Sequence, residues 1–179
     1  MKKGFIVFTV LFICFSVQSC KKRGCTISYA ANFDATAIKD DKSCTFYYKT
    51  HINGIKVLDF PEFDPNGAFW DAGGLPDLYV RITDKEDAIK YQTPVITEVA
   101  PEDTVEWSIP VSVTLDTISA NSQFKLYEVD ETSAELIEKF PINFVDYMHE
   151  STSGLDKYPD SILFSGNSAT VVIYLNWVE

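Results

Sequence analysis

The chain has 179 residues, 46% of them apolar, and carries a net charge of −11 at pH 7. This apolar content is ordinary for a globular protein and argues against disorder beyond a short leader. The excess of acid repels nucleic acid and anionic lipid head groups, and the length suits one domain with a leader.

Residues 1–19 are predicted to be a secretory signal, because two lysines precede an apolar run at residues 4–17 that is too short to span a membrane. The run ends in Val17-Gln18-Ser19-Cys20, which resembles the lipobox of bacterial lipoproteins. The resemblance implies cleavage before Cys20 and acylation of its thiol; ordinary secretion with cleavage elsewhere is the alternative. Removing residues 1–19, which hold two lysines and no acid, makes the charge −13.

Residues 20–44 are predicted to form an acylated cysteine, a basic spacer and a disulfide-closed module. With Cys14 lost in the signal and Cys20 acylated, Cys25 and Cys44 remain and are expected to pair in an oxidising compartment. The run from Gly24-Cys25-Thr26 to Asp40-Asp41-Lys42-Ser43-Cys44 resembles a short disulfide module of exported Bacteroidetes proteins. A loop of this size closed by one bridge is stabilised by roughly 3 kcal/mol on the chain-entropy model.

From residue 45 the sequence alternates with period two, and β-branched and aromatic runs are broken by Gly, Pro, Asn and Asp. This pattern predicts strands. The expected strands cover residues 55–60, 78–82, 90–98, 111–115, 123–129, 142–147, 161–164 and 169–178. Residues 133–139 are either a short helix or a turn that leads into a strand. We therefore expect residues 45–179 to form an antiparallel two-sheet β-sandwich of about eight strands, an all-β fold.

Two acidic clusters lie where predicted strands end, and both resemble the calcium-binding loops of C2 domains. Asp71 and Asp77 flank a Gly-rich loop and open the strand Leu78-Tyr79-Val80. Glu128 and Asp130 end another strand, and Glu135 follows before Leu136-Ile137. The resemblance implies a C2-like fold and names these five acids as calcium ligands, although Glu replaces the more usual Asp twice and Glu138 stands where the family has Gly.

Calcium binds six to eight oxygen ligands, which carboxylates on two adjacent loops can supply. Without a cation the acids repel one another, and some of their pKa values are expected to rise. Phe69 and Trp70 lie beside the first loop, and the resemblance implies that they contact a membrane or a partner; Trp70 is expected to be exposed. The alternative is that these acids are simply solvated, as most surface carboxylates are.

An enzyme is not expected. His51 and His149 stand in no metal-ligand spacing, and the sequence has no nucleophile motif or phosphate-binding glycine loop. We expect instead a tethered, non-catalytic binding module, stabilised by calcium, that contacts an envelope protein or a lipid surface. The alternatives are a metal-free structural subunit of an outer-membrane or cell-surface complex, and a carbohydrate-binding lipoprotein using Phe69, Trp70 and Tyr79.

The location follows from the leader. Lys21 and Lys22 do not resemble the acidic signal that follows the cysteine of many surface-exposed Bacteroidetes lipoproteins. We therefore expect the anchor to hold the protein at the periplasmic face of the outer membrane.

Overall fold

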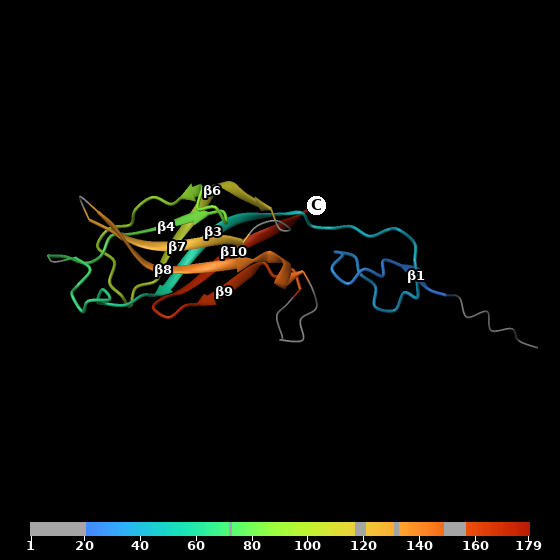
Figure 1. The fold of residues 1–179 in the computed structure, drawn as a ribbon, viewed down its shortest axis with the longest axis horizontal. Coiled ribbons are helices and arrows are strands. Elements are labelled where there is room, and N and C mark those ends of the chain that lie inside the picture. Colours follow the sequence, from blue (N-terminus) through green and yellow to red (C-terminus); the bar gives the residue numbers. More distant parts are fainter. Residues whose placement is uncertain (1–20, 72, 117–120, 131–132, 149–156) are drawn as a thin grey trace, which may run out of the picture.

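The structure is a computed structural model that describes residues 21–71, 73–116, 121–130, 133–148 and 157–179. The predicted signal and lipid-attachment residue Cys20 lie outside these ranges. Within the described part of the chain, no helix has the length and hydropathy needed to cross a bilayer. Figure 1 shows a sandwich of two sheets with a small N-terminal module at one end.

Both large sheets are antiparallel and contain four strands each, so the prediction of a two-sheet β-sandwich of about eight strands is confirmed. The first sheet has the order β6-β3-β10-β9, formed by Val105–Asp116, Lys49–Asp59, Thr170–Val178 and Ser161–Ser165. The second has the order β5-β4-β7-β8, formed by Ile89–Gln92, Leu78–Thr83, Asn121–Val129 and Ala134–Asn143. Alternate side chains from both sheets fill the core between them, as the period-two pattern predicts.

Three expected elements differ from the structure. The expected strand at 90–98 ends at Gln92, as β5, and residues 93–98 belong to the connection that follows it. Residues 134–139 belong to strand β8 rather than to a helix, so this part of the chain is neither the helix nor a turn but already strand. The expected strand at 142–147 ends at Asn143 and continues as a single 3-10 turn, η1 (Phe144–Tyr147). Asn143 begins this turn because its side-chain oxygen accepts a hydrogen bond from the backbone N–H of Val145.

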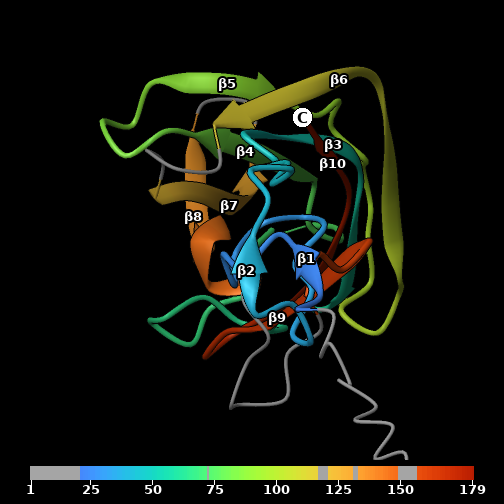
Figure 2. The same ribbon diagram turned by 90° about the vertical axis from the view of Figure 1, so that its right-hand side faces the viewer.

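The N-terminal module contains two short parallel strands, β1 (Arg23–Gly24) and β2 (Lys39–Asp40), and the predicted disulfide between Cys25 and Cys44. Figure 2 looks along the long axis with this module in front of the sandwich. Lys157 joins the two parts, because its ammonium donates to the backbone oxygens of Ser28 and Ala30, 3.1 and 2.9 Å away. The module is therefore docked on the sandwich through specific contacts.

Chain direction separates the module from the acidic loops. Strand β3 leaves the module and runs the length of the sandwich, and the connection from β3 to β4 lies at the far end. The β5–β6 and β7–β8 connections lie at that far end too, because successive strands are antiparallel. We call this end, formed by residues 60–71, 73–77, 93–104, 130 and 133, the acidic end.

Candidate functional site

The strand register brings the two predicted acidic clusters to one place. Glu128 on β7 is paired with Leu78 on one side and with Glu135 of β8 on the other. Asp77 directly precedes Leu78, and its backbone oxygen accepts a hydrogen bond from the N–H of Val129. Neighbouring strand ends therefore hold the acids of both loops side by side at the acidic end.

Glu128 is the buried member of this group. Its exposed fraction is 1%, and its Oε2 has no hydrogen-bond partner among the described residues. Burial and then the charges of the other four predicted ligands, Asp130, Glu135, Asp71 and Asp77, together raise the pKa of Glu128 from 4.5 to about 7. A like charge disfavours the ionised form of a neighbouring acid, so the five carboxyl groups are electrostatically coupled.

A cavity of about 470 Å³ opens between the loops and is lined by Asp71, Asp77, Val95, Val129 and Asp130. Asp71 also accepts a hydrogen bond from the N–H of Gly73, which fixes the Gly-rich turn after it. Three of the five predicted ligands, Asp71, Asp77 and Asp130, thus line one water-accessible space, whereas Glu128 and Glu135 are not among its lining residues.

The chemistry of these donors fits calcium, which prefers carboxylate and carbonyl oxygens in a flexible shell. Glu128 adds a buried oxygen without a partner, which a cation would satisfy. Among the residues that the structure describes, however, no three His, Cys, Asp or Glu side chains lie close enough together to hold a metal ion. The acids that line the cavity therefore do not form a coordination shell in this structure.

Sequence analysis missed one acid at this end. Glu98, in the connection between β5 and β6, accepts a hydrogen bond from the N–H of Leu75 at 3.0 Å and donates its own N–H to Asp77 Oδ1 at 2.9 Å. No motif marks it, since its neighbours in the sequence carry no ligand-like spacing. Only the long-range hydrogen bonds reveal its place beside Asp77.

The aromatic residues of the acidic end differ from the prediction in one respect. Phe69 is 61% exposed and packs against Phe63, with ring centroids 4.8 Å apart. Trp70 is only 7% exposed, because it packs on the core and its Nε1 donates to the backbone oxygen of Pro61. The expectation of an exposed Trp70 was therefore wrong, whereas Phe69, Phe63, Leu75 and Val95 are apolar and exposed at this end.

The aromatic set considered for carbohydrate binding is not assembled as a platform. Tyr79 is 3% exposed, and its ring stacks on Tyr127 with the Arg81 guanidinium over both rings. With Trp70 buried as well, Phe69 is the one member of that set with a large exposed surface.

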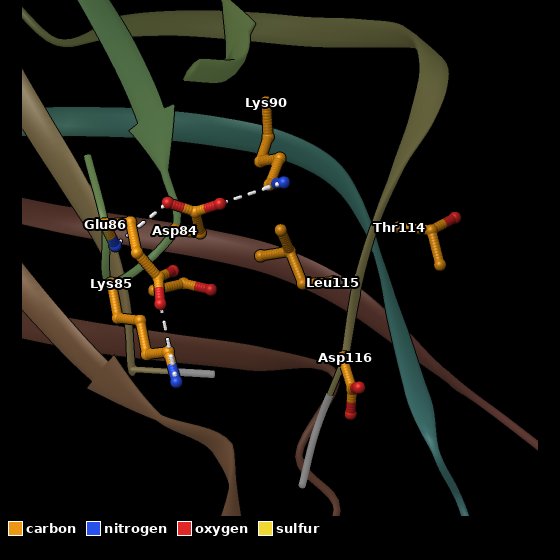
Figure 3. A pocket seen from close by; sticks show the side chains of 8 residues that line it. Asp84, Lys85, Glu86, Lys90, Thr114, Leu115 and Asp116 are labelled. Carbon is orange, nitrogen blue, oxygen red and sulfur yellow. Dashed lines mark hydrogen bonds and ion pairs between the residues drawn. The ribbon is translucent and has the colours of Figure 1, made fainter. Parts of the chain in front are cut away.

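A second cavity, of about 310 Å³, lies near the opposite end of the sandwich (Figure 3). Its lining residues are Asp84, Lys85, Glu86, Lys90, Thr114, Leu115, Asp116 and Ser122. Asp84 forms an ion pair with Lys90 at 2.9 Å and accepts the N–H groups of Glu86 and Ala88, which lowers its pKa. Asp84 is thus engaged within the protein and differs in that respect from Glu128.

No family model and no curated protein matches the sequence. Three-dimensional comparison finds C2 domains. One solved C2 domain is 11% identical with a TM-score of 0.47, and the match covers 74% of this chain and all of that one. A C2 domain of plant extended synaptotagmin 1 is 14% identical with a TM-score of 0.43, over 73% of this chain and 94% of that one.

The calcium-bound pair of C2 domains of extended synaptotagmin 2 is 16% identical with a TM-score of 0.46, and the match covers 73% of this chain but 45% of that one. At such identities and scores the likeness carries no information about ligands. The sandwich itself is established by the strands and their pairing.

Proposed function

We propose that the chain is a membrane-tethered, non-catalytic binding module whose acidic end binds calcium and thereby contacts another component of the cell envelope. The observation that carries the proposal is Glu128, a carboxyl group 1% exposed, with an unpartnered oxygen, in the field of the four other predicted ligands. A buried acid without a partner is costly to the fold unless a ligand or a proton satisfies it. Calcium is the ligand that this oxygen-rich group of acids fits.

Cation binding would change the surface that the acidic end presents. Without a cation, the carboxylates repel an anionic surface or partner. With calcium bound, that repulsion is removed while the apolar side chains of Phe63, Phe69, Leu75 and Val95 stay exposed beside the ion. A neutral, partly apolar surface of this kind favours contact with a protein or a lipid surface.

The tether is the predicted acylated Cys20, at the periplasmic face of the outer membrane. The chain enters the described structure through the N-terminal module, which is at the opposite end from the acids. This arrangement supports a partner that approaches from the side away from the anchor. An envelope protein meets that requirement better than the lipid that holds the anchor, so we favour a protein partner.

Thermal unfolding in chelator and across a calcium titration tests the proposal. A ligand that binds only the native state adds about 2.7 kcal/mol at 100 times its Kd, so the unfolding midpoint should rise with calcium. The rise should vanish in the double variant Asp71→Asn with Asp77→Asn. Asp160→Asn with Glu179→Gln removes the same charge at the other end of the sandwich and should keep the rise. A midpoint that stays constant to millimolar calcium would exclude a calcium site.

A second candidate function is supported by a different surface. The register places Gln92, Arg81, Lys125 and Lys139 in one row across the four strands of the second sheet. Lys125 is 9% exposed and ion-paired with Asp87 at 2.9 Å, so Arg81 and Lys139 are the cations of this row that favour a metal-free docking subunit binding an acidic partner through this sheet. The variant Lys139→Glu reverses the charge of an exposed residue of this row. If the sheet is the docking surface, this variant should no longer capture the partner. If the acidic end binds the partner through calcium, capture should be unchanged.

A further inference from the structure

Charge is divided unevenly between the two parts of the chain. Residues 21–48, which contain the N-terminal module and its link to β3, hold five cations and three acids, a net charge of +2. Residues 49–179 hold eight cations and 23 acids, a net charge of −15. Because salt screens charges beyond about 8 Å, an anionic surface that meets the module feels its cations more strongly than the distant acids of the sandwich.

The cations of the module gather around β1 and β2. Figure 2 shows these two strands at the end of the molecule that faces the viewer. The strands are parallel, and their register pairs Arg23 with Lys39. All five cations of the module are exposed, namely Lys21, Lys22, Arg23, Lys39 and Lys42. We call these five residues, together with Ile38, the basic tip.

Arg23 and Lys39 lie opposite each other without a counter-charge. Neighbouring strands are about 4.8 Å apart, and like charges at opposed positions destabilise a pair of strands. Within the described ranges neither residue forms an ion pair, whereas Lys22 is paired with Asp34 at 2.7 Å. An anionic group from outside the chain would relieve the repulsion between Arg23 and Lys39.

The other two acids of the module bond to their own backbone. Asp40 Oδ1 accepts the N–H of Lys42, and Asp41 Oδ1 accepts the N–H of Ser43, each at 3.0 Å. These carboxylates fix the turn that follows β2, so the basic tip keeps its cations available to an external partner.

An apolar side chain lies among these cations. Ile38 is 64% exposed, and its N–H donates to the backbone oxygen of Lys22 at 3.0 Å. At a bilayer interface, apolar side chains enter the boundary of the acyl chains while the charged ends of Lys and Arg stay at the head groups. A lipid surface therefore accommodates both kinds of side chain in the basic tip, whereas an acidic peptide would satisfy the cations alone.

We propose that the basic tip rests on the anionic phospholipid head groups of the membrane that holds the anchor, with Ile38 at the boundary of the acyl chains. Lys21 directly follows the predicted acylation site Cys20, so acylation there would bring the tip to the bilayer. Clusters of Lys and Arg beside a membrane anchor are attracted by anionic head groups. This inference rests on the proposed tether and adds a second contact that orients the sandwich.

Vesicle sedimentation of the unacylated protein tests the basic tip by itself. The chain from residue 20 with Cys20→Ser keeps every described residue and cannot be acylated. In chelator, where the proposed calcium contact is absent, it should bind vesicles of phosphatidylcholine with phosphatidylglycerol but not vesicles of phosphatidylcholine alone. In this background Arg23→Gln with Lys39→Gln should weaken binding roughly thirtyfold, because two cations at the surface are lost.

Two further variants separate local contact from overall charge. Lys56→Gln with Lys139→Gln removes the same charge from the sandwich and should leave vesicle binding unchanged. Ile38→Ser keeps every charge and should weaken binding several-fold, because the apolar contact is lost. A loss of binding that is equal in the two double variants, or unchanged binding in Ile38→Ser, would overturn the inference.

The remaining outcomes keep this inference apart from the proposed function. If the Cys20→Ser chain binds both kinds of vesicle equally, or binds neither, the basic tip does not recognise anionic lipid. If it binds polyglutamate instead, the tip docks an acidic protein, which overturns the inference as well. None of these results bears on the acyl anchor or on calcium, since both are absent from the experiment.

Discussion

Glu128 lies at the end of β7, where the fold buries a carboxyl group beside like charges, and its titration gives a prediction at the scale of one residue. Its pKa rises from 4.5 to about 7 in the folded protein. Between these values the folded state binds more protons than the unfolded chain, so the free energy of unfolding must fall as pH rises through this window. In chelator the loss should reach at most about 3 kcal/mol by pH 7 and then level off.

Urea unfolding at several pH values between 4 and 8 measures this loss. Glu128→Gln should remove the dependence within the window, because glutamine does not titrate, while Glu135→Gln, at an exposed site, should only reduce it. Calcium should flatten the wild-type curve, since the ion takes the place of the proton. An unchanged slope in Glu128→Gln would assign the pH dependence to other groups.

At the scale of single elements, Glu138 on β8 caps the turn between β9 and β10. Its Oε2 accepts the N–H groups of Asn167 and Ser168, both at 2.9 Å, and a Cβ atom on Gly166 would stand 2.8 Å from it. We expect Glu138→Ala to lower the free energy of unfolding by about 1 kcal/mol in urea titration, because two charge-assisted hydrogen bonds are lost. Glu106→Ala should cost less, since its contact to Lys56 is an exposed pair at 3.9 Å. Equal losses of unfolding free energy in the two variants would show that the Glu138 cap does not stabilise the fold.

The same strand shows where sequence reasoning succeeded and where it did not. Period-two runs located most strands, because each strand buries alternate residues between the sheets. In β8 a register shift opposite Leu126 and Tyr127 breaks that alternation, so that Ile137 and Phe140 are both buried. A spacing of three resembles one face of a helix, which is why residues 133–139 were ambiguous. Pairing with β7 decides the strand, and pairing is not visible in local sequence.

The candidate site was predictable to a similar degree. Acids that end strands in a familiar spacing could be named from the sequence, because the spacing reflects how neighbouring strand ends meet. Glu98 could not, since its place depends on hydrogen bonds to Leu75 and Asp77 from more than twenty residues away. The burial of Trp70 was missed because its partner, the Pro61 backbone oxygen, is set by the course of the loop.

At the scale of the whole molecule, the N-terminal module and the acidic end lie apart. Strand β3 has 11 residues between them, which at about 3.3 Å per residue is roughly 36 Å. Lys157 and Tyr158 hold the module to the sandwich, since the Tyr158 hydroxyl donates to the Tyr29 backbone oxygen and the Lys157 ammonium lies 5.3 Å from the Phe33 ring centroid. With the proposed acylation of Cys20, a body fixed in this way would carry the acidic end away from the membrane.

This geometry predicts the outcome of a distance measurement on the acylated protein in vesicles. A fluorophore on Asn66→Cys, at the acidic end, should escape quenching by spin-labelled lipid head groups, whereas the same dye on Asp160→Cys, near the module, should be quenched. Lys157→Ala removes the bonds to Ser28 and Ala30 and should increase quenching at position 66, because the sandwich can then tilt toward the lipid. Equal quenching at both positions in the protein that keeps Lys157 would mean that the sandwich lies along the membrane. The acidic end would then face the anchoring lipid rather than a partner beyond it.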